Sequence, residues 1–106
     1  MGVPEPFVVL MRVHLHLPDA HSLKAKRSEV NPVKSWLRQR LGAAVAEVCH
    51  HDAWQRSMLA VSVCGDSPAR CQEAVDAIRR YLDQRFPDGV RVDEQLVSWS
   101  DLEAMR

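Results

Sequence analysis

Cysteine and long apolar runs are scarce in this 106-residue sequence, and their scarcity excludes several protein classes. The three cysteines form no Cys-x-x-Cys pair, which argues against a disulfide framework and favours reduced thiols. The longest apolar stretch, Phe7–Met11, ends at Arg12, whereas a helix needs about 20 apolar residues to span a bilayer. No basic segment followed by an apolar one marks a secretory leader. We therefore expect a cytoplasmic protein that does not enter the membrane.

Signatures of the common enzyme classes are missing as well. The sequence has no G-x-S-x-G, H-E-x-x-H, P-loop or G-x-G-x-x-G motif. These motifs position nucleophiles, metals or phosphates. Their absence predicts no catalytic residues and no cofactor.

Net charge is also absent, because 14 Lys and Arg balance 14 Asp and Glu. This balance argues against a protein that binds polyanions over its whole surface. The charge is unevenly spread, however. Between Ala20 and Gly42 the only acid is Glu29, and it is accompanied by six cations: Lys24, Lys26, Arg27, Lys34, Arg38 and Arg40. This local excess marks a candidate binding surface.

Length and composition favour one domain, residues 1–106, in which 1–6 form an extension and 101–106 a tail. Apolar residues at every second position predict a strand over 7–17. Ser22 caps a helix that ends near Gly42, with apolar residues at helical spacing. Pro32 inside this helix predicts a kink, or a restart with Asn31 as the cap.

The central part of the sequence predicts a hairpin of strands 44–51 and 54–64 with a turn at Asp52 and Ala53. Alternation places Val45, Glu47, Cys49 and His51 on one face of this hairpin. The opposite, inward face is expected to hold Ala44, Ala46 and Val48 with Leu59, Val61 and Val63.

Ser67 then caps a second helix, which Pro87-Asp88-Gly89 ends, and residues 90–100 form a fourth strand. The order β-α-β-β-α-β predicts an α+β protein with the ferredoxin-like split β-α-β sandwich fold. Its antiparallel sheet has strand order 4-1-3-2, with two helices on one face. Five residues are expected to be buried together in the core: Leu37, Leu59, Val61, Val63 and Ile78.

Two motifs at a matching separation resemble those of a known family. Residues 22–27, S-L-K-A-K-R, resemble its S-L-K-x-K-R signature, and A-E-V at 46–48 with D-A-W-Q-R at 52–56 resembles its hairpin. The sequence is therefore similar to the YlxP-like proteins, a small bacterial family of unknown function. The resemblance covers nearly the whole chain and implies a ferredoxin-like fold, with no established catalytic or ligand residue. The family's genes often lie near those for a translation initiation factor and ribosome-binding factor A, which implies a link to ribosomes or RNA.

Four of the cations share one side of the first helix. At about 100° per residue they lie within roughly 80° of one another, with Asn31 between them: Lys24, Arg27, Lys34 and Arg38. We call these four residues the basic stripe. Such a stripe can contact a run of phosphates, and the alternative is an ordinary solvated helix face.

Lys26 falls inside the apolar arc of the same helix. We expect its side chain to extend to solvent, and the alternative is a lysine that belongs to a binding site.

Further candidates lie on the strands. Glu47 and Arg56 are expected to form a cross-strand ion pair, with Trp54 covering the end of the hairpin. Alternatively, Trp54 and Arg56 contact a partner. The open sheet face is expected to expose apolar side chains suited to a homodimer: Val8, Leu10, Val45, Met58, Val97 and Trp99. Base stacking is not expected there, because the central strands present no aromatic residue on that face.

Two pairs resemble the start of a metal site: His14 with His16, and Cys49 with His51. They lie on the first and second strands, which are not neighbours in the predicted order, so no metal site is expected. The sequence thus predicts a non-enzymatic accessory protein that associates with structured RNA or a ribosomal particle through the basic stripe. The alternative is a homodimeric protein-interaction module that uses the open sheet face.

Overall fold

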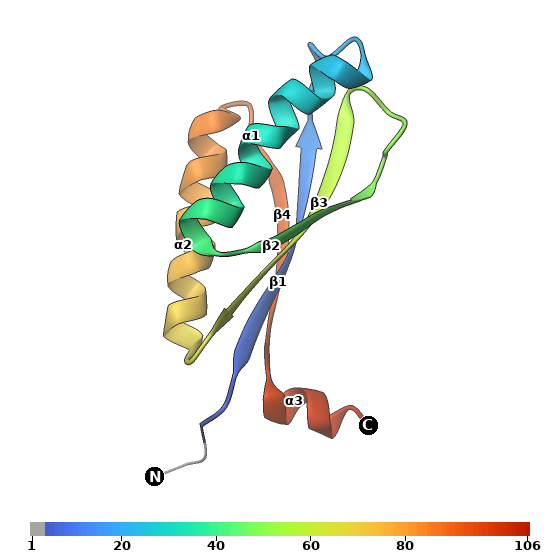
Figure 1. Ribbon diagram of the computed structural model, residues 1–106. Helices are drawn as coiled ribbons and strands as arrows, with labels where there is room; N and C mark the ends of the chain where they lie inside the picture. Colours follow the sequence, from blue (N-terminus) through green and yellow to red (C-terminus); the bar gives the residue numbers. More distant parts are fainter. Residues whose placement is uncertain (1–3) are drawn as a thin grey trace.

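The computed structural model describes residues 4–106, in which two helices cover one face of a four-stranded antiparallel sheet (Figure 1). The strands occur in the order β2-β3-β1-β4, which confirms the predicted ferredoxin-like sandwich. Their bounds are β1 (Phe7–His16), β2 (Ala44–Cys49), β3 (Arg56–Gly65) and β4 (Arg91–Ser98). The helices are α1 (Leu23–Leu41), α2 (Pro68–Arg85) and a short α3 (Trp99–Ala104). Of the expected extension, residues 1–3 lie outside the described part of the chain.

Helix α1 begins and ends at the predicted residues. The Ser22 side chain caps its first turn, and Gly42, at φ 62°, closes its last turn in the left-handed conformation that glycine adopts without strain. The helix is continuous through Pro32, so the expected restart at Asn31 is wrong. Proline leaves the Ser28 carbonyl without its helical partner. Both residues are exposed, so water can solvate that carbonyl.

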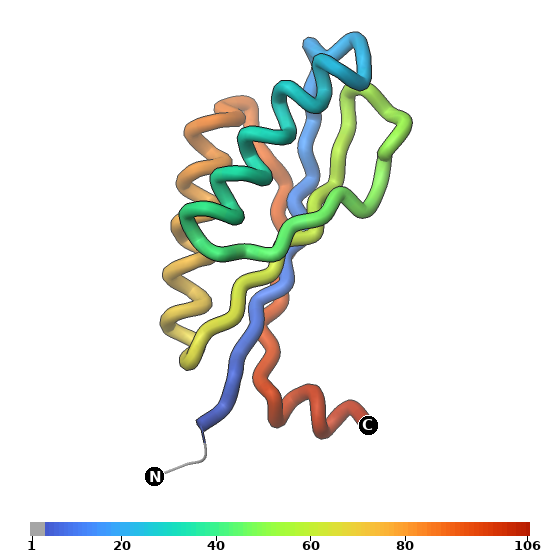
Figure 2. Tube along the Cα trace, viewed as in Figure 1, coloured from blue at the N-terminus to red at the C-terminus, as the bar shows by residue number. Residues whose placement is uncertain are grey.

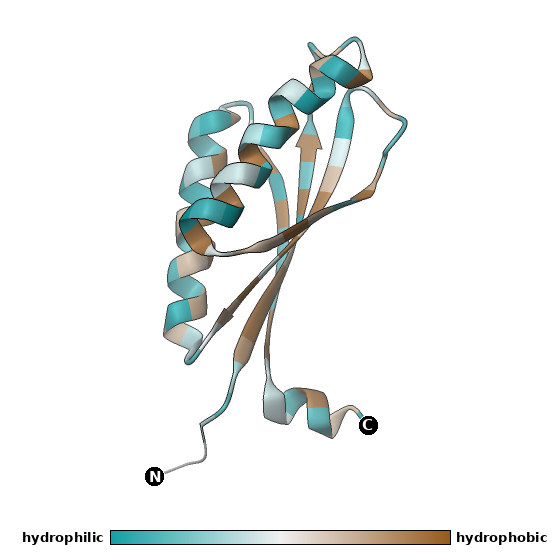
Figure 3. Cartoon of the chain, in the orientation of Figure 1, coloured by the Kyte–Doolittle hydropathy of each residue, from teal (hydrophilic) through white to brown (hydrophobic). Residues whose placement is uncertain are grey.

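The core lies between the sheet and the two long helices. All five residues predicted to form it belong to one buried cluster, with Leu37, Leu59 and Ile78 fully buried. β1 contributes the apolar face that its alternation predicted, including Val9, Met11 and Val13. Hydrophobic residues are concentrated along the strands, and the helices carry hydrophilic residues toward solvent (Figure 3). The rings of Trp36 and Tyr81 stack with centroids 4.0 Å apart and join α1 to α2.

The hairpin of β2 and β3 differs from the prediction, because the two faces of β2 are exchanged. Val45 lies opposite Val61, and Glu47 lies opposite Leu59, so Val45 and Glu47 face the helices. The outward side of β2 consists of the exposed residues Ala44, Ala46 and Val48.

Two physical reasons account for this difference. A valine at the core-facing position removes more apolar area from water than an alanine does. The prediction also assumed a two-residue turn, which keeps the alternation of one strand in step with that of the other. A bulge between Glu47 and Cys49 and the positive φ of His50 (64°) shift this register. Residues 50–55 form the loop, in place of the predicted turn at Asp52 and Ala53.

The C-terminal part of the chain also differs from the prediction. β4 ends at Ser98, two residues early, and the expected tail 101–106 is largely helical. Ser98 and Asp101 form a reciprocal capping box that starts α3 at Trp99. The backbone N–H of Trp99 donates to the Pro6 carbonyl at 3.0 Å, which connects α3 to the segment that leads into β1. α3 lies at the end of the sheet where β1 begins and extends away from α1 and α2 (Figure 2).

Candidate nucleic-acid interface

The basic stripe of α1 lies mainly along the seam between α1 and the edge strand β2. Arg27 and Lys34 line a hollow of about 160 Å³ at this seam, together with Asn31 of the same helix and two residues of the hairpin, Glu47 and His51. One turn after Lys34, the Arg38 guanidinium donates to the Val45 carbonyl of β2 at 2.9 Å. Lys24, at the start of the helix, is exposed but does not line the hollow. The fold therefore brings three of the four predicted cations to one seam.

Lys26 is buried beside this seam and does not extend to solvent as expected. Only 3% of the residue is exposed, and its ammonium nitrogen lies 3.1 Å from Glu47 Oε2. The ammonium also donates to the His50 carbonyl at 2.7 Å, and the buried Ser57 hydroxyl donates to the same Glu47 oxygen. The expected ion pair of Glu47 with Arg56 is wrong, because Glu47 faces the helices. The Lys26 ammonium can be buried here because its counter-charge, the partly buried Glu47 carboxylate, lies beside it.

The Glu47 carboxyl titrates under opposing influences. Its partial burial raises the pKa, but hydrogen bonds from Ser57 and Lys26 and the positive charge of Lys26 outweigh that effect. Together they hold the pKa below its ordinary value of 4.5. At neutral pH the carboxylate is therefore charged and neutralises Lys26. The remaining positive charge at the seam comes from Arg27, Lys34 and Arg38.

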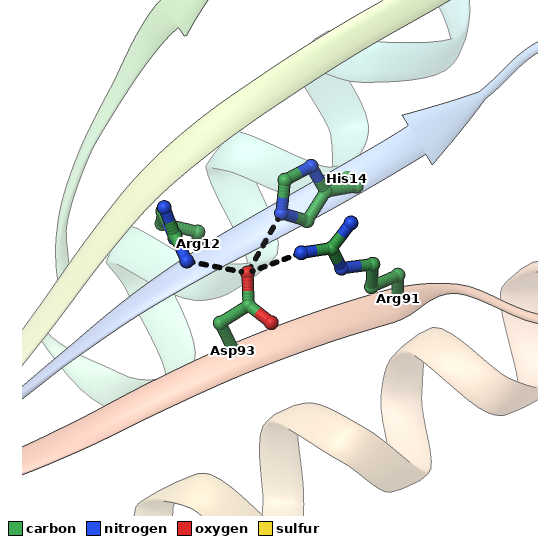
Figure 4. A network of polar contacts seen from close by, with 4 residues as sticks. All are labelled: Arg12, His14, Arg91 and Asp93. Carbon is green, nitrogen blue, oxygen red and sulfur yellow. Dashed lines mark hydrogen bonds and ion pairs between the residues drawn. The ribbon is translucent and has the colours of Figure 1, made fainter.

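A second polar cluster, which the sequence reasoning missed, lies on the open face of the sheet (Figure 4). One Asp93 oxygen lies 2.9 Å from His14 Nε2, 3.1 Å from the Arg12 guanidinium and 3.5 Å from that of Arg91. The His14 hydrogen bond, followed by the charges of Arg91 and Arg12, lowers the pKa of Asp93. The β1–β4 register sets Arg12 opposite Asp93 and His14 opposite Arg91. Because the predicted order already made these strands neighbours, pairing the cations of one strand with acids of the other could have found this cluster.

The predicted interaction surface is divided between two places. Leu10, which is 51% exposed, shares the open face with the half-buried Met58 and Val97. Val45 does not belong to this face, and Trp99 begins α3 instead of lying within the fourth strand as predicted.

The other part of the surface lies in the hairpin loop and at the start of β3. The Trp54 and Arg56 side chains are exposed and line a shallow hollow of about 300 Å³. This hollow is separate from the one at the α1–β2 seam.

Two structural features are absent from residues 4–106. No group of three or more His, Cys, Asp or Glu residues in this range is placed to hold a metal ion. The same residues include no helix that is long and apolar enough to cross a membrane.

The fold and the seam define a small ferredoxin-like α+β protein with a basic face on its first helix. A family model described as "Protein of unknown function (DUF503)" matches residues 8–95, and the chain belongs to that family. It is also similar to "Uncharacterized protein YlxP" of Bacillus subtilis (strain 168), with 23% identity over 70 residues. This match covers 66% of the present chain and 75% of that protein. The resemblance to YlxP-like proteins is thereby confirmed.

Two solved structures show the same fold. The de novo designed protein Foldit4 matches with a TM-score of 0.58 and 12% identity, over 87% of this chain and 96% of that one. The VAO-type flavoprotein MtVAO713 from Myceliophthora thermophila C1 matches with a TM-score of 0.54 and 15% identity, over 96% of this chain. The match covers only 20% of the flavoprotein. At these identities the likeness concerns the fold alone.

Proposed function

We propose that the protein is a non-enzymatic accessory factor that binds structured RNA, free or within a ribosomal particle, through the basic stripe of α1. The observation that carries this proposal is the placement of Arg27, Lys34 and Arg38 along one seam. Each side chain presents a cation where phosphate groups can approach. The ribosomal gene neighbours noted for YlxP-like proteins agree with this proposal.

The charges around the stripe favour an anionic partner. Within α1 the only acid is Glu29, and the nearby Glu47 is already neutralised by Lys26 at 3.1 Å. The cations act mainly on phosphates, which carry no sequence information, so we expect slight sequence specificity. Binding should weaken steeply as salt rises, because each neutralised phosphate releases counterions.

Charge reversal on α1 tests the proposal. The double variant Arg27→Glu/Arg38→Glu should lose binding to a fluorescent RNA hairpin in an anisotropy titration. When cell lysate is sedimented at low salt, this variant should also no longer be found in the ribosomal fractions. For single neutralisations, Arg27→Gln and Arg38→Gln, the slope of log affinity against log salt should fall by about 1 each.

A matched control comes from α2. Arg70→Glu/Arg80→Glu reverses two exposed arginines on the other long helix, so it changes the net charge equally. Arg79 is unsuitable as a control because it pairs with Glu94 at 2.7 Å. Circular dichroism would check that each variant is folded, since Arg38→Glu also removes the hydrogen bond to Val45. Equal loss of binding in both double variants would mean that only net charge matters, and unchanged binding in both would refute the proposal.

A second candidate is a homodimer formed through the open sheet face. The observation that favours it is the 51% exposure of Leu10 on the face that it shares with Met58 and Val97. Met58→Glu would place a charge in such an interface and should shift the mass in light scattering from dimer to monomer. A wild-type protein that stays monomeric at high micromolar concentration would exclude this candidate.

A further inference from the structure

We propose that the hollow between α1 and β2 is a binding site for a single terminal phosphate group, meaning a phosphate monoester or inorganic phosphate. The hollow lies along the basic stripe, and the inference rests on the proposed function only in the case where the phosphate belongs to an RNA. The same chemistry is offered by the 5′ end of an RNA or by a small phosphorylated molecule. What the two sources share is a compact tetrahedral dianion.

The size of the hollow suits such a group. Its volume is about 160 Å³. This space corresponds to roughly five water molecules and lies below the 300–1,000 Å³ typical of drug-sized ligand pockets. The hollow therefore has room for one phosphate group, and the rest of a nucleotide would lie outside it. An internal phosphodiester, with a sugar on both sides, is also a poorer match than a chain end.

The charge of the lining suits a dianion. Lys26, Arg27 and Lys34 contribute three positive charges, and Glu47 contributes one negative charge. The surplus of two matches the charge of a phosphate monoester near neutral pH, which is about −1.5 to −2. Glu47 would repel a phosphate on its own, but Lys26 neutralises it at 3.1 Å.

The hydrogen-bond donors that line the hollow also favour a phosphate group. An ammonium has three N–H groups, and the structure assigns two acceptors to that of Lys26: the His50 carbonyl and Glu47. Lys26 is at the same time part of the lining. Besides the third N–H of Lys26, the side chains of Arg27, Asn31 and Lys34 supply donors to the lining of the same hollow from successive turns of α1. Because Lys26 is held in place before any ligand arrives, this donor loses little freedom on binding.

An NMR titration of the full-length protein with inorganic phosphate tests the site. At constant ionic strength, backbone amides of residues 26–34 and 47–51 should shift saturably with phosphate and not with chloride. Lys34→Gln should weaken phosphate binding by about tenfold or more, the effect of one lost charge-assisted hydrogen bond. Arg27→Gln serves as a second variant, since Arg27 is exposed and its replacement should leave the fold intact. Arg80→Gln on α2 should change nothing.

Two further arms separate this inference from the RNA proposal and identify the source of the phosphate. Arg38→Glu should reduce RNA binding but leave the phosphate titration unchanged, because Arg38 belongs to the stripe and does not line the hollow. A hairpin with a 5′-phosphate should bind more tightly than its 5′-hydroxyl form if RNA ends are the source. Equal binding of both forms alongside saturable phosphate binding assigns the site to a small molecule. Shifts that do not saturate, or that survive both Lys34→Gln and Arg27→Gln, would overturn the inference even if RNA binding persists.

Discussion

Glu47→Gln removes one charge from the mostly enclosed Lys26–Glu47 pair, and the loss in unfolding free energy measures the cost of leaving Lys26 without its counter-charge. The Lys26 side chain is 4% exposed and that of Glu47 is 18% exposed. Breaking a buried ion pair by removing one partner costs about 3–5 kcal/mol, because the other charge stays buried without compensation. Here we expect about 2–3 kcal/mol, since water reaches Glu47 and a glutamine oxygen can still accept from Ser57.

The second half of this prediction is a double-mutant cycle. Lys26→Met/Glu47→Gln removes both charges and keeps the lysine's apolar stem, so its stability should return to within about 1 kcal/mol of the wild type. The assay is urea unfolding at pH 7 followed by far-ultraviolet circular dichroism. A loss below about 1 kcal/mol in Glu47→Gln, or a double variant as unstable as the sum of both single variants, would refute the reasoning.

The same pair makes a pH prediction whose sign follows from the lowered pKa of Glu47. Its stabilising contribution is complete above pH 4.5, the ordinary value, and is lost as pH falls through the lower pKa of the folded protein. The unfolding free energies of wild type and Glu47→Gln should therefore differ most near neutral pH and converge in acid. A difference that stays constant down to pH 2 would show that the carboxylate charge is not responsible.

Three shorter predictions concern the rest of the molecule. Leu37→Ala and Ile78→Ala should each cost roughly 2–5 kcal/mol in urea unfolding, because both side chains are fully buried; a loss under about 1 kcal/mol at both sites would contradict the core. Gly42→Ala should destabilise the protein by about 1 kcal/mol, since alanine is strained at φ 62°, whereas Gly42→Asn should cost less. The Asp93 carboxyl should titrate below its ordinary 3.8 in an NMR experiment, and His14→Ala should raise that pKa; an unchanged value would mean that the pair does not form in solution.

Local patterns in the sequence were enough to predict the main elements and the fold. Alternation along residues 7–17 identified the inward face of β1, and helical spacing identified the buried sides of α1 and α2. Ser22, Gly42 and Ser67 marked helix ends because capping depends on a few neighbouring residues. The alignment of cations on α1 also followed from helical geometry alone, whereas their meeting with β2 did not.

Only the tertiary structure determined which face of β2 points inward and whether Lys26 is buried. A one-residue slip in a strand exchanges its two faces, and the bulge after Glu47 is not visible in the alternation of a six-residue strand. The prediction chose the face of Ala44 and Ala46 as the inward one and therefore placed Glu47 outward. Separately, it expected Lys26 to extend to solvent from its place near the helix end. In the fold, the position of Lys26 against the sheet and the inward turn of Glu47 depend on each other, because neither charge can be buried alone. Lys26 on α1 and Glu47 on β2 carry no local sign of such a partnership, because the two residues meet only when the helix packs beside the edge strand.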